Sequence, residues 1–176
     1  MDVVKALSLR QGDVVVDLGC GSGYFTLKLS SQAGKHGRVI AEDIRRLPLV
    51  FLWLRTLRDK DHNVSITHGK PTDPYLPVGK VNAVLISNTY RELSEPQALL
   101  AYVWQSLVSG GRLVVLDRAP SPSNVGITED GEHEISASHV EADLRQARFE
   151  ILSRQDHFIE SDPDHEAWWL IVVRKP

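Results

Sequence analysis

The chain has 176 residues, of which 42% are hydrophobic and 24% charged, and its formal net charge is −3 at pH 7. These values are those of a soluble globular protein whose length suits one domain with a substantial core. The slightly acidic balance, with a pI near 6.1, gives no long-range attraction to nucleic acid or to an anionic membrane. The N-terminal sequence lacks the basic and apolar regions of a signal peptide, and the single cysteine, Cys20, cannot form an internal disulfide. We therefore expect a cytoplasmic protein with no nucleic-acid or membrane partner.

The first predicted elements are a short amphipathic helix over 3–9 and a strand, turn and helix that begin at residue 14. Three valines followed by Asp17 are typical of a buried parallel strand. Glycines then occupy three alternate positions, namely Gly19, Gly21 and Gly23. Apolar residues at helical spacing follow, and the predicted helix runs to about Ala33. A strand, a glycine turn and a helix form the opening of a nucleotide-binding βαβ unit.

The spacing of these glycines separates two classes of nucleotide site. A dinucleotide-binding turn has the pattern G-x-G-x-x-G, whereas this chain has G-x-G-x-G. Asp17, two residues before the first glycine, would repel a pyrophosphate but suits the ammonium and sulfonium of S-adenosylmethionine. Residues 16–23, VDLGCGSG, resemble motif I of the class I S-adenosylmethionine-dependent methyltransferases. The resemblance implies that this turn borders the cofactor through Asp17, Gly19, Cys20, Gly21 and Gly23.

A second apolar strand with an acidic end is predicted over Arg38–Ile44. Asp43 lies 20 residues beyond Gly23, where a carboxylate at the tip of the second strand can accept both ribose hydroxyls. Glu42 is the alternative, because neighbouring side chains in a strand point to opposite faces and only one of them is expected to face the site. We also place Ile44 beside the cofactor, directly after Asp43.

The second long helix is predicted over Leu47–Leu57, and it is apolar on more than one face. One apolar stripe comprises Leu47, Val50, Leu54 and Leu57, while other large apolar residues lie off it. One stripe is expected to pack on the sheet. The remaining apolar side chains are either covered by neighbouring loops or form a subunit contact, which makes a homodimer through this helix a possible arrangement.

A third strand, Val64–His68, leads into the proline-rich loop 69–77. In the resembled family this loop borders the adenine, and an acidic or amide side chain there accepts a hydrogen bond from the adenine amino group. The resemblance assigns this role to Asp73. Lys70 stands where many relatives have an acid.

The fourth predicted strand, Val81–Ser87, ends in polar residues that are expected to face the methyl donor. We take Asn88, Tyr90 and Arg91 as the catalytic candidates, and Asn88 also as a cofactor-binding residue. Arg91 replaces a histidine that is common in similar small bacterial methyltransferases. It would favour an anionic or carboxylate-bearing acceptor.

The remaining elements complete an alternating α/β pattern. A helix capped by Ser94 precedes a glycine turn and a strand over Arg112–Leu116, and the polar segment 118–139 is interpreted as a flap over the site. A helix over Ser138–Arg148 and two strands that can pair as a hairpin end the chain. The methyltransferase resemblance implies a Rossmann-like, doubly wound seven-stranded sheet, mostly parallel with an antiparallel last strand, and one methyltransferase domain over 1–176.

Two classes of function remain open on the sequence. The first is an S-adenosylmethionine-dependent methyltransferase that moves a methyl group to a small-molecule acceptor. The second is a methyltransferase-like module that binds the cofactor or a partner protein without turnover. No histidine or cysteine spacing predicts a metal site. The acceptor is not specified by any motif.

Overall fold

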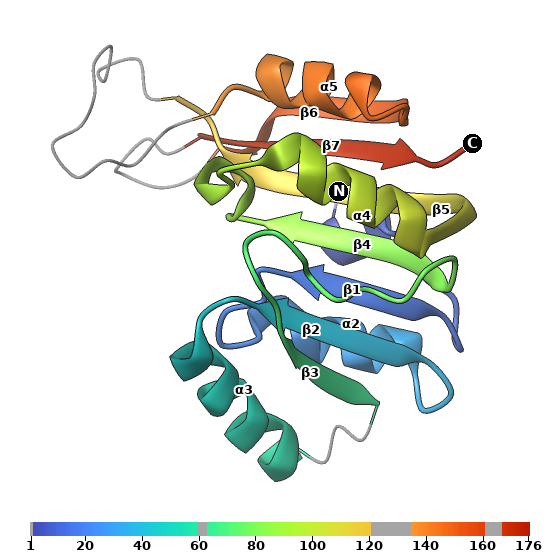
Figure 1. The fold of residues 1–176 in the computed structure, drawn as a ribbon, viewed down its shortest axis with the longest axis vertical. Helices are drawn as coiled ribbons and strands as arrows, with labels where there is room; N and C mark the ends of the chain where they lie inside the picture. Colours follow the sequence, from blue (N-terminus) through green and yellow to red (C-terminus); the bar gives the residue numbers. More distant parts are fainter. Residues whose placement is uncertain (1, 60–62, 121–134, 161–166) are drawn as a thin grey trace, which may run out of the picture.

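The computed structural model describes residues 2–59, 63–120, 135–160 and 167–176, which form a single seven-stranded sheet with helices on both faces (Figure 1). In chain order the elements are α1 (Val3–Ala6), β1 (Val14–Leu18), α2 (Tyr24–Ala33), β2 (Arg38–Asp43), α3 (Arg46–Asp59), β3 (Val64–His68), β4 (Val81–Ser87), the 3-10 turn η1 (Tyr90–Glu92), α4 (Pro96–Ser106), β5 (Leu107–Arg118), α5 (Ala137–Gln146), β6 (Glu150–Glu160) and β7 (Ala167–Arg174). No helix in these ranges is long and apolar enough to cross a membrane.

The strand order is β3-β2-β1-β4-β5-β7-β6. Strands β1 to β5 pair in parallel, and β7 lies between β5 and β6, antiparallel to both. The predicted doubly wound sheet with an antiparallel last strand is therefore confirmed. The chain passes from β1 to β2 on one side and reaches β4 on the other. The carboxyl ends of β1 and β4 thus form the switch point at which open α/β sheets bind ligands.

Side-chain alternation along the central strands divides the core into two layers. Val16 of β1 packs in a cluster with Leu100 of α4 and Val140 of α5, whereas the adjacent Val15 packs with Leu29 of α2 on the other face. All five residues are fully buried. Both faces of β1 are thus covered, which is why its sequence is continuously apolar rather than alternating.

Several element boundaries differ from the prediction by one to five residues, and two of these differences have a local cause. Helix α4 has Glu95, not Ser94, as its N-cap, and no side chain caps it; Pro96 in the first turn lacks the N–H that would need a partner. Strand β5 begins at Leu107 rather than Arg112, because the two glycines continue the strand. The Gly110 N–H donates to the Lys175 oxygen at 2.7 Å, and the ladder with β4 shifts register nearby. Residues 121–134 of the predicted flap and most of the predicted hairpin turn lie outside the described residues.

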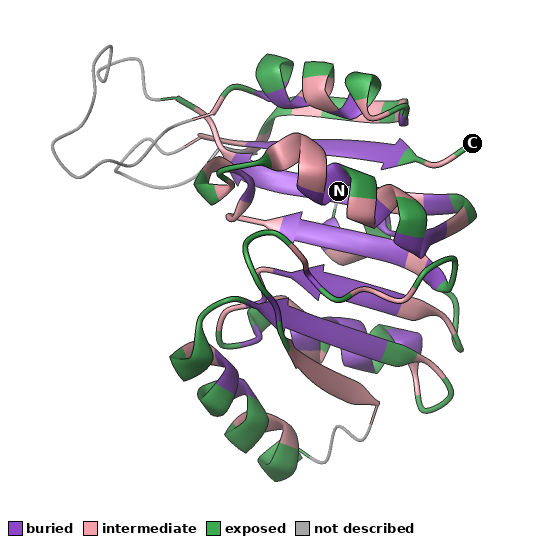
Figure 2. Cartoon of the chain, in the orientation of Figure 1, coloured by how far each residue is buried: buried purple, intermediate pink, exposed green. Residues whose placement is uncertain are grey.

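Helix α3 presents its apolar stripe to solvent, contrary to a stripe facing the sheet (Figure 2). Its buried residues are Leu49 and Leu52, and Leu52 packs where a Cβ on Gly23 would stand. The four stripe residues Leu47, Val50, Leu54 and Leu57 are each at least half exposed. The side chains of Leu49 and Leu52 pack this helix against the edge of the sheet. The longer apolar stripe remains exposed to solvent.

Candidate functional site

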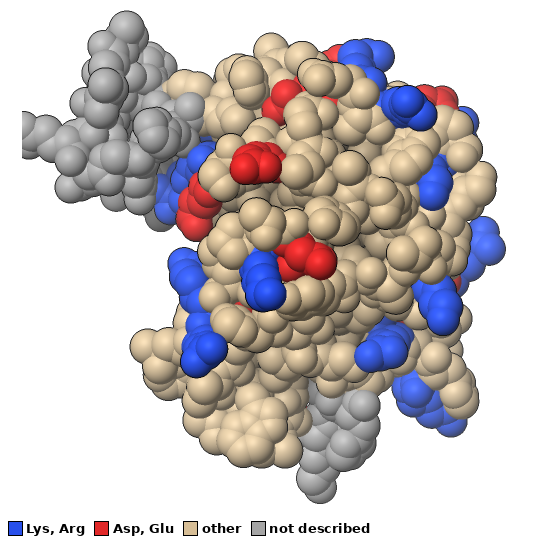
Figure 3. All heavy atoms as spheres, in the orientation of Figure 1, with Lys and Arg blue, Asp and Glu red and all other residues tan. Residues whose placement is uncertain are grey.

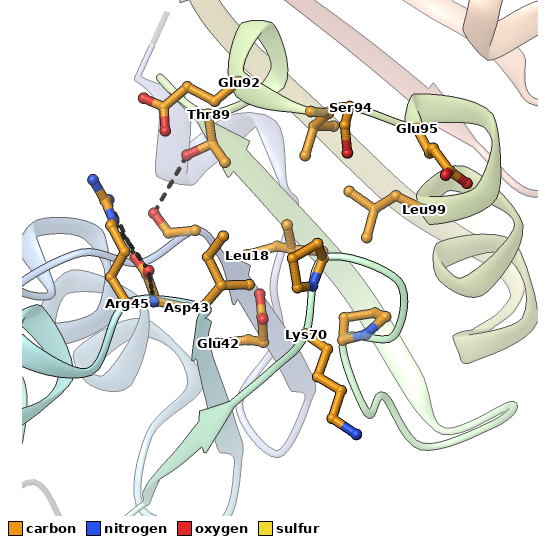
Figure 4. A pocket seen from close by; sticks show the side chains of 15 residues that line it. Leu18, Glu42, Asp43, Arg45, Lys70, Thr89, Glu92, Ser94, Glu95 and Leu99 are labelled. Carbon is orange, nitrogen blue, oxygen red and sulfur yellow. Dashed lines mark hydrogen bonds and ion pairs between the residues drawn. The ribbon is translucent and has the colours of Figure 1, made fainter.

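Two cavities meet at Gly19, at the carboxyl ends of β1, β2 and β4. The first, which we call the β2-side cavity, has a volume of about 120 Å³ (Figure 4). It is lined by Leu18, Gly19, Glu42, Asp43, Ile44, Arg45, Lys70, Pro71, Pro74, Thr89, Glu92, Leu93, Ser94, Glu95 and Leu99. The second, the β4-side cavity, has a volume of about 540 Å³ and is lined by Asp2, Val3, Asp17, Gly19, Cys20, Tyr24, Phe25, Lys28, Ser87, Asn88, Leu116 and Trp168. A ligand that crosses Gly19 can therefore occupy both.

The glycine turn is shaped by close packing at one position and open space at another. Gly19 has φ +72°, and a Cβ there would overlap the side chain of Thr89. Gly21 has φ +53° and nothing within 4 Å of the position of a Cβ. Gly19 thus permits contact between the β1 turn and the residues after β4, whereas Gly21 leaves room for a ligand against the main chain. Helix α2, which follows, has no side-chain cap at its N-terminus.

Asp43, at the end of β2, is hydrogen-bonded to the glycine turn. Its carboxylate accepts hydrogen bonds from the Gly21 N–H at 2.9 Å and from the Arg45 N–H at 2.8 Å. The Arg45 guanidinium adds an ion pair, with Nε at 3.2 Å. The Asp43 side chain is 2% exposed but that of Arg45 is 57% exposed. An arginine that is mostly in water can move aside for a ligand, so the Asp43 carboxylate is available to polar hydrogens in the β2-side cavity.

Asp17 provides the negative charge beside the β4-side cavity. It is buried at the end of β1, and its carboxylate accepts a hydrogen bond from Thr26 Oγ1 at 2.6 Å. Burial raises the pKa of Asp17 to about 6, against the lowering effect of the Thr26 hydrogen bonds. The group is thus largely ionised at neutral pH in a place where its charge is poorly compensated, which favours a bound cation. Neighbouring Cys20 is also buried, and burial raises the pKa of its thiol.

Glu42 lines the same cavity as Asp43, which corrects the expectation that only one of them could do so. The two side chains do point to opposite faces of β2, but the β2-side cavity extends around the end of the strand. Glu42 is 3% exposed, and burial, followed by the charge of Asp43, raises its pKa to about 7. Ile44, the next residue along, lines this cavity as expected and is 49% exposed.

Arg91 forms a buried ion pair, so its guanidinium is not directed at an acceptor. Arg91 Nη1 lies 2.7 Å from Asp117 Oδ1 and 2.6 Å from Asn88 Oδ1, to which it donates. The Arg91 side chain is 8% exposed and that of Asp117 is fully buried. Asn88, which lines the β4-side cavity, is held in a left-handed conformation with φ +55°. The hypothesis that Arg91 favours an anionic acceptor is therefore not supported, and Arg91 instead positions Asn88.

Two other predicted site residues line neither cavity. Tyr90 is 1% exposed in the core cluster with α4 and α5, and its hydroxyl donates to Asp143 Oδ2 at 2.9 Å. This placement corrects its assignment as a catalytic candidate. Asp73 Oδ1 accepts a hydrogen bond from the Tyr75 N–H at 2.8 Å, and the residue lines neither cavity. Its carboxylate closes its own turn.

Sequence reasoning missed Thr89 and Arg45 among the cavity residues. Thr89 Oγ1 donates to Ser87 O at 3.0 Å and lies near Gly19 O, at 3.4 Å. Neither its residue type nor its position indicated a role, because the contact joins turns 70 residues apart. Arg45 follows Asp43 by two residues, a spacing that could have suggested the pair. Within the part of the chain that the structure describes, no three histidine, cysteine or acidic side chains are grouped so as to hold a metal ion.

Comparison with known proteins identifies the family. A family model described as "Methyltransferase domain" matches residues 15–111, which is more than half of the chain. The ubiquinone/menaquinone biosynthesis C-methyltransferase UbiE of Yersinia pestis (strain Pestoides F) is 32% identical over 116 residues, covering 65% of this chain and 46% of the relative. The chain thus spans about half the length of the curated relatives it matches.

The fold is shared with solved structures of low sequence identity. A SAM dependent methyltransferase from Aquifex aeolicus has a TM-score of 0.81 at 20% identity, covering 97% of this chain and 86% of that one. The geranyl diphosphate C-methyltransferase of Streptomyces coelicolor A3(2) has a TM-score of 0.81 at 17% identity, with coverages of 99% and 78%. The [4+2]-cyclase SpnF has a TM-score of 0.85 at 17% identity, with the same coverages. Because a cyclase shares the architecture, the activity must be argued from the site. The family match and the glycine turn between Asp17 and Asp43 show that the chain belongs to the methyltransferase domain family, among the class I S-adenosylmethionine-dependent methyltransferases.

Proposed function

We propose that this chain binds S-adenosylmethionine across Gly19 and transfers its methyl group to a small-molecule acceptor. The observation that carries the proposal is the meeting of two cavities at Gly19. One of them contains a buried carboxylate suited to hydroxyl groups, Asp43, and the other a buried carboxylate suited to a cation, Asp17. The cofactor has the same order of groups, with ribose hydroxyls on one side and a sulfonium and ammonium on the other.

Different residues contact the ribose, the base and the amino-acid part of the proposed cofactor. Asp43 accepts the ribose hydroxyls after Arg45 moves aside, and Ile44 packs against the base in the β2-side cavity. The amino-acid part follows the open main chain of the glycine turn, which comprises Gly19, Cys20, Gly21 and Gly23, with Asn88 opposite it. Asp73 is left out of this assignment, because its carboxylate is occupied by the Tyr75 N–H.

Methyl transfer needs positioning more than acid or base catalysis. The displacement is in line and its leaving group is a neutral thioether, so no protein acid has to assist departure. Holding donor and acceptor in this geometry can supply about 7–11 kcal/mol of the barrier. Asn88 is the residue placed to orient the reacting groups, because Arg91 Nη1 fixes its amide and the strained backbone fixes its direction. A base is required only if the acceptor atom carries a proton.

The β4-side cavity supports a small acceptor with an apolar ring or chain. Tyr24, Phe25, Leu116 and Trp168 contribute its apolar walls, and its volume of about 540 Å³ is within the range of small-molecule sites. The relatives named for quinone biosynthesis and for geranyl diphosphate methylation point to the same class of acceptor. We also propose a cytoplasmic location and a single methyltransferase domain over 1–176, which the single cysteine and the continuous sheet support.

Calorimetric titration with S-adenosylmethionine and S-adenosylhomocysteine, with NAD as the control ligand, tests the cofactor assignment. We expect saturable binding of both sulfur compounds and about 100-fold weaker binding by Asp43→Ala, because two hydrogen bonds to a charged group are lost. Asp73→Asn is the matched control: its amide oxygen can still accept from the Tyr75 N–H, so its affinity should equal that of the wild type. A folded wild-type protein that binds neither compound would contradict the proposal and favour a module that acts through a partner.

We further propose a homodimer through the exposed stripe of α3. Leu47, Val50, Leu54 and Leu57 are spaced alternately three and four residues apart, as in a helix–helix seam, and each is at least half exposed. The surface over α3, at the lower left of Figure 3, is largely uncharged. Sedimentation velocity should show a dimer that Leu54→Glu converts to a monomer, with Arg58→Ala on the same helix as a control. A wild-type protein that stays monomeric up to high concentration would refute the dimer.

A further inference from the structure

The β2-side cavity is lined by a buried carboxyl group that has no side-chain partner among the described residues. Glu42 is 3% exposed, and no described side chain donates to its carboxylate or forms an ion pair with it. The Gly19 N–H hydrogen-bonds to the main-chain oxygen of Glu42 at 2.9 Å and also lowers the pKa of its carboxyl. A buried carboxylate with so little compensation destabilises the fold, which implies that it has a use in the bound state.

The loop after β3 leaves space for the Glu42 carboxyl group. A Cβ at Gly69 would overlap Glu42 Oε1, so the glycine leaves the space that the carboxyl occupies. Lys70 extends away from Glu42 (Figure 4), and its ammonium lies 5.5 Å from the centre of the Tyr75 ring. The only residue with an acidic side chain in the loop, Asp73, is turned to the Tyr75 N–H. The loop residues that line the cavity are Lys70, Pro71 and Pro74, so the loop brings no acceptor side chain to it, and the buried carboxyl group there comes from Glu42 of β2.

The rest of the cavity suits a flat, largely apolar group. Leu18, Pro71, Pro74, Leu93 and Leu99 contribute apolar atoms around the carboxyl. The second buried carboxylate, Asp43, is already bonded to Gly21 and Arg45. A ligand here thus meets apolar walls and, in Glu42, a buried carboxyl group with no side-chain partner among the described residues. The other carboxylates that line the cavity are Asp43, which is placed for the ribose hydroxyls, and the exposed Glu92 and Glu95. Apolar walls and a buried acceptor are the requirements of a purine that carries an amino group.

We propose that Glu42 is the residue that recognises the adenine of the cofactor, by accepting a hydrogen bond from its amino group. This inference rests on the proposed function, since it assumes that adenosine enters the β2-side cavity. The carboxyl pKa of about 7 lets the protonated form contribute as well, because its O–H can donate to the adjacent ring nitrogen while its carbonyl oxygen accepts. The charged groups around it are Asp43 and Arg45 from β2 and its following turn, Lys70 from the loop, and Glu92 and Glu95 after β4.

The test combines a truncated ligand with a truncated side chain. Binding of S-adenosylhomocysteine and of its 6-deamino purine analogue is measured for the wild type, Glu42→Met, Glu42→Gln and Asp43→Ala. We expect the wild type to prefer the amino compound about 10-fold, the gain of one hydrogen bond to a charged group. The Glu42→Met variant carries an apolar side chain of similar length that needs no hydrogen-bond partner. It should therefore bind both compounds equally. Glu42→Gln should restore the preference through its amide oxygen.

The outcomes separate this inference from the cofactor proposal. Asp43→Ala should weaken both compounds together and keep the preference, because it acts on the ribose. Melting curves verify that each variant is folded, and Glu150→Gln on β6 serves as a distant carboxylate control. A Glu42→Met protein that retains the full preference for the amino compound overturns the role of Glu42 while leaving cofactor binding intact. Failure of the folded wild type to bind S-adenosylhomocysteine overturns both.

Discussion

Arg91→Ala should lower the free energy of unfolding by about 3–5 kcal/mol, the usual cost of removing one partner of a buried ion pair. Asp117 is fully buried, and its carboxylate accepts from Arg91 Nη1, the Arg91 N–H and the Arg118 N–H. Without the guanidinium, two main-chain donors are left to compensate a charge inside the protein. Urea unfolding of wild type and variant at neutral pH measures the difference.

The same substitution should reduce methyl transfer, because Arg91 Nη1 also holds the amide oxygen of Asn88 at 2.6 Å. Arg174→Ala is the matched control for stability. It breaks an ion pair with Glu150 in which both side chains are about half exposed, and such pairs are worth about 0–1 kcal/mol. If Arg91→Ala were as mild as Arg174→Ala, the buried pair would not be a stabilising element. Arg91→Lys should be intermediate, since one ammonium cannot reproduce the forked contacts to Asn88 and Asp117.

The strand and helix order of this chain could be predicted because each signal was local. Three valines, alternating glycines and an acid at the end of the next strand specify one βαβ unit within thirty residues, and the structure places Asp17 and Asp43 at neighbouring strand ends as expected. The insertion of β7 between β5 and β6 was different. It followed from the methyltransferase resemblance, since nothing in the apolar pattern of β7 fixes its neighbours in the sheet.

The site residues that sequence reasoning misplaced depend on contacts between distant segments. Tyr90 lies among polar residues after β4, yet its ring packs in the core because Asp143, 53 residues later, accepts a hydrogen bond from its hydroxyl. The pairing of Arg91 is not visible in its own segment, because its partner Asp117 lies 26 residues later in β5. The exposed stripe of α3 was not resolvable from periodicity, because Leu49 and Leu52 satisfy a helical pattern as well. In each case the deciding partner was remote in sequence.

The stability of the unliganded protein should fall as the pH rises from about 4 to about 8. The pKa of Asp17 is raised from 3.8 to about 6 and that of Glu42 from 4.5 to about 7, mainly by burial. Between these values the folded state binds more protons than the unfolded state, so stability is fully present below the unfolded pKa values and is lost as the folded groups ionise. At 1.36 kcal/mol per pKa unit, each group removes on the order of 3 kcal/mol.

Urea unfolding at pH 5 and pH 8 measures this loss, and Asp17→Asn and Glu42→Gln should each abolish part of it by making the protein more stable at pH 8. Glu141→Gln provides a control of opposite sign, because ion pairs with Arg145 and Arg154 lower the pKa of Glu141 and its charge stabilises the folded state. Saturating S-adenosylmethionine should flatten the dependence, since a cation beside Asp17 favours its ionised form. A protein whose stability rises steadily from pH 5 to pH 8, in the wild type and both variants alike, would mean that these carboxyls are not buried at the carboxyl ends of β1 and β2. It would also remove the electrostatic argument for a cationic ligand at Asp17.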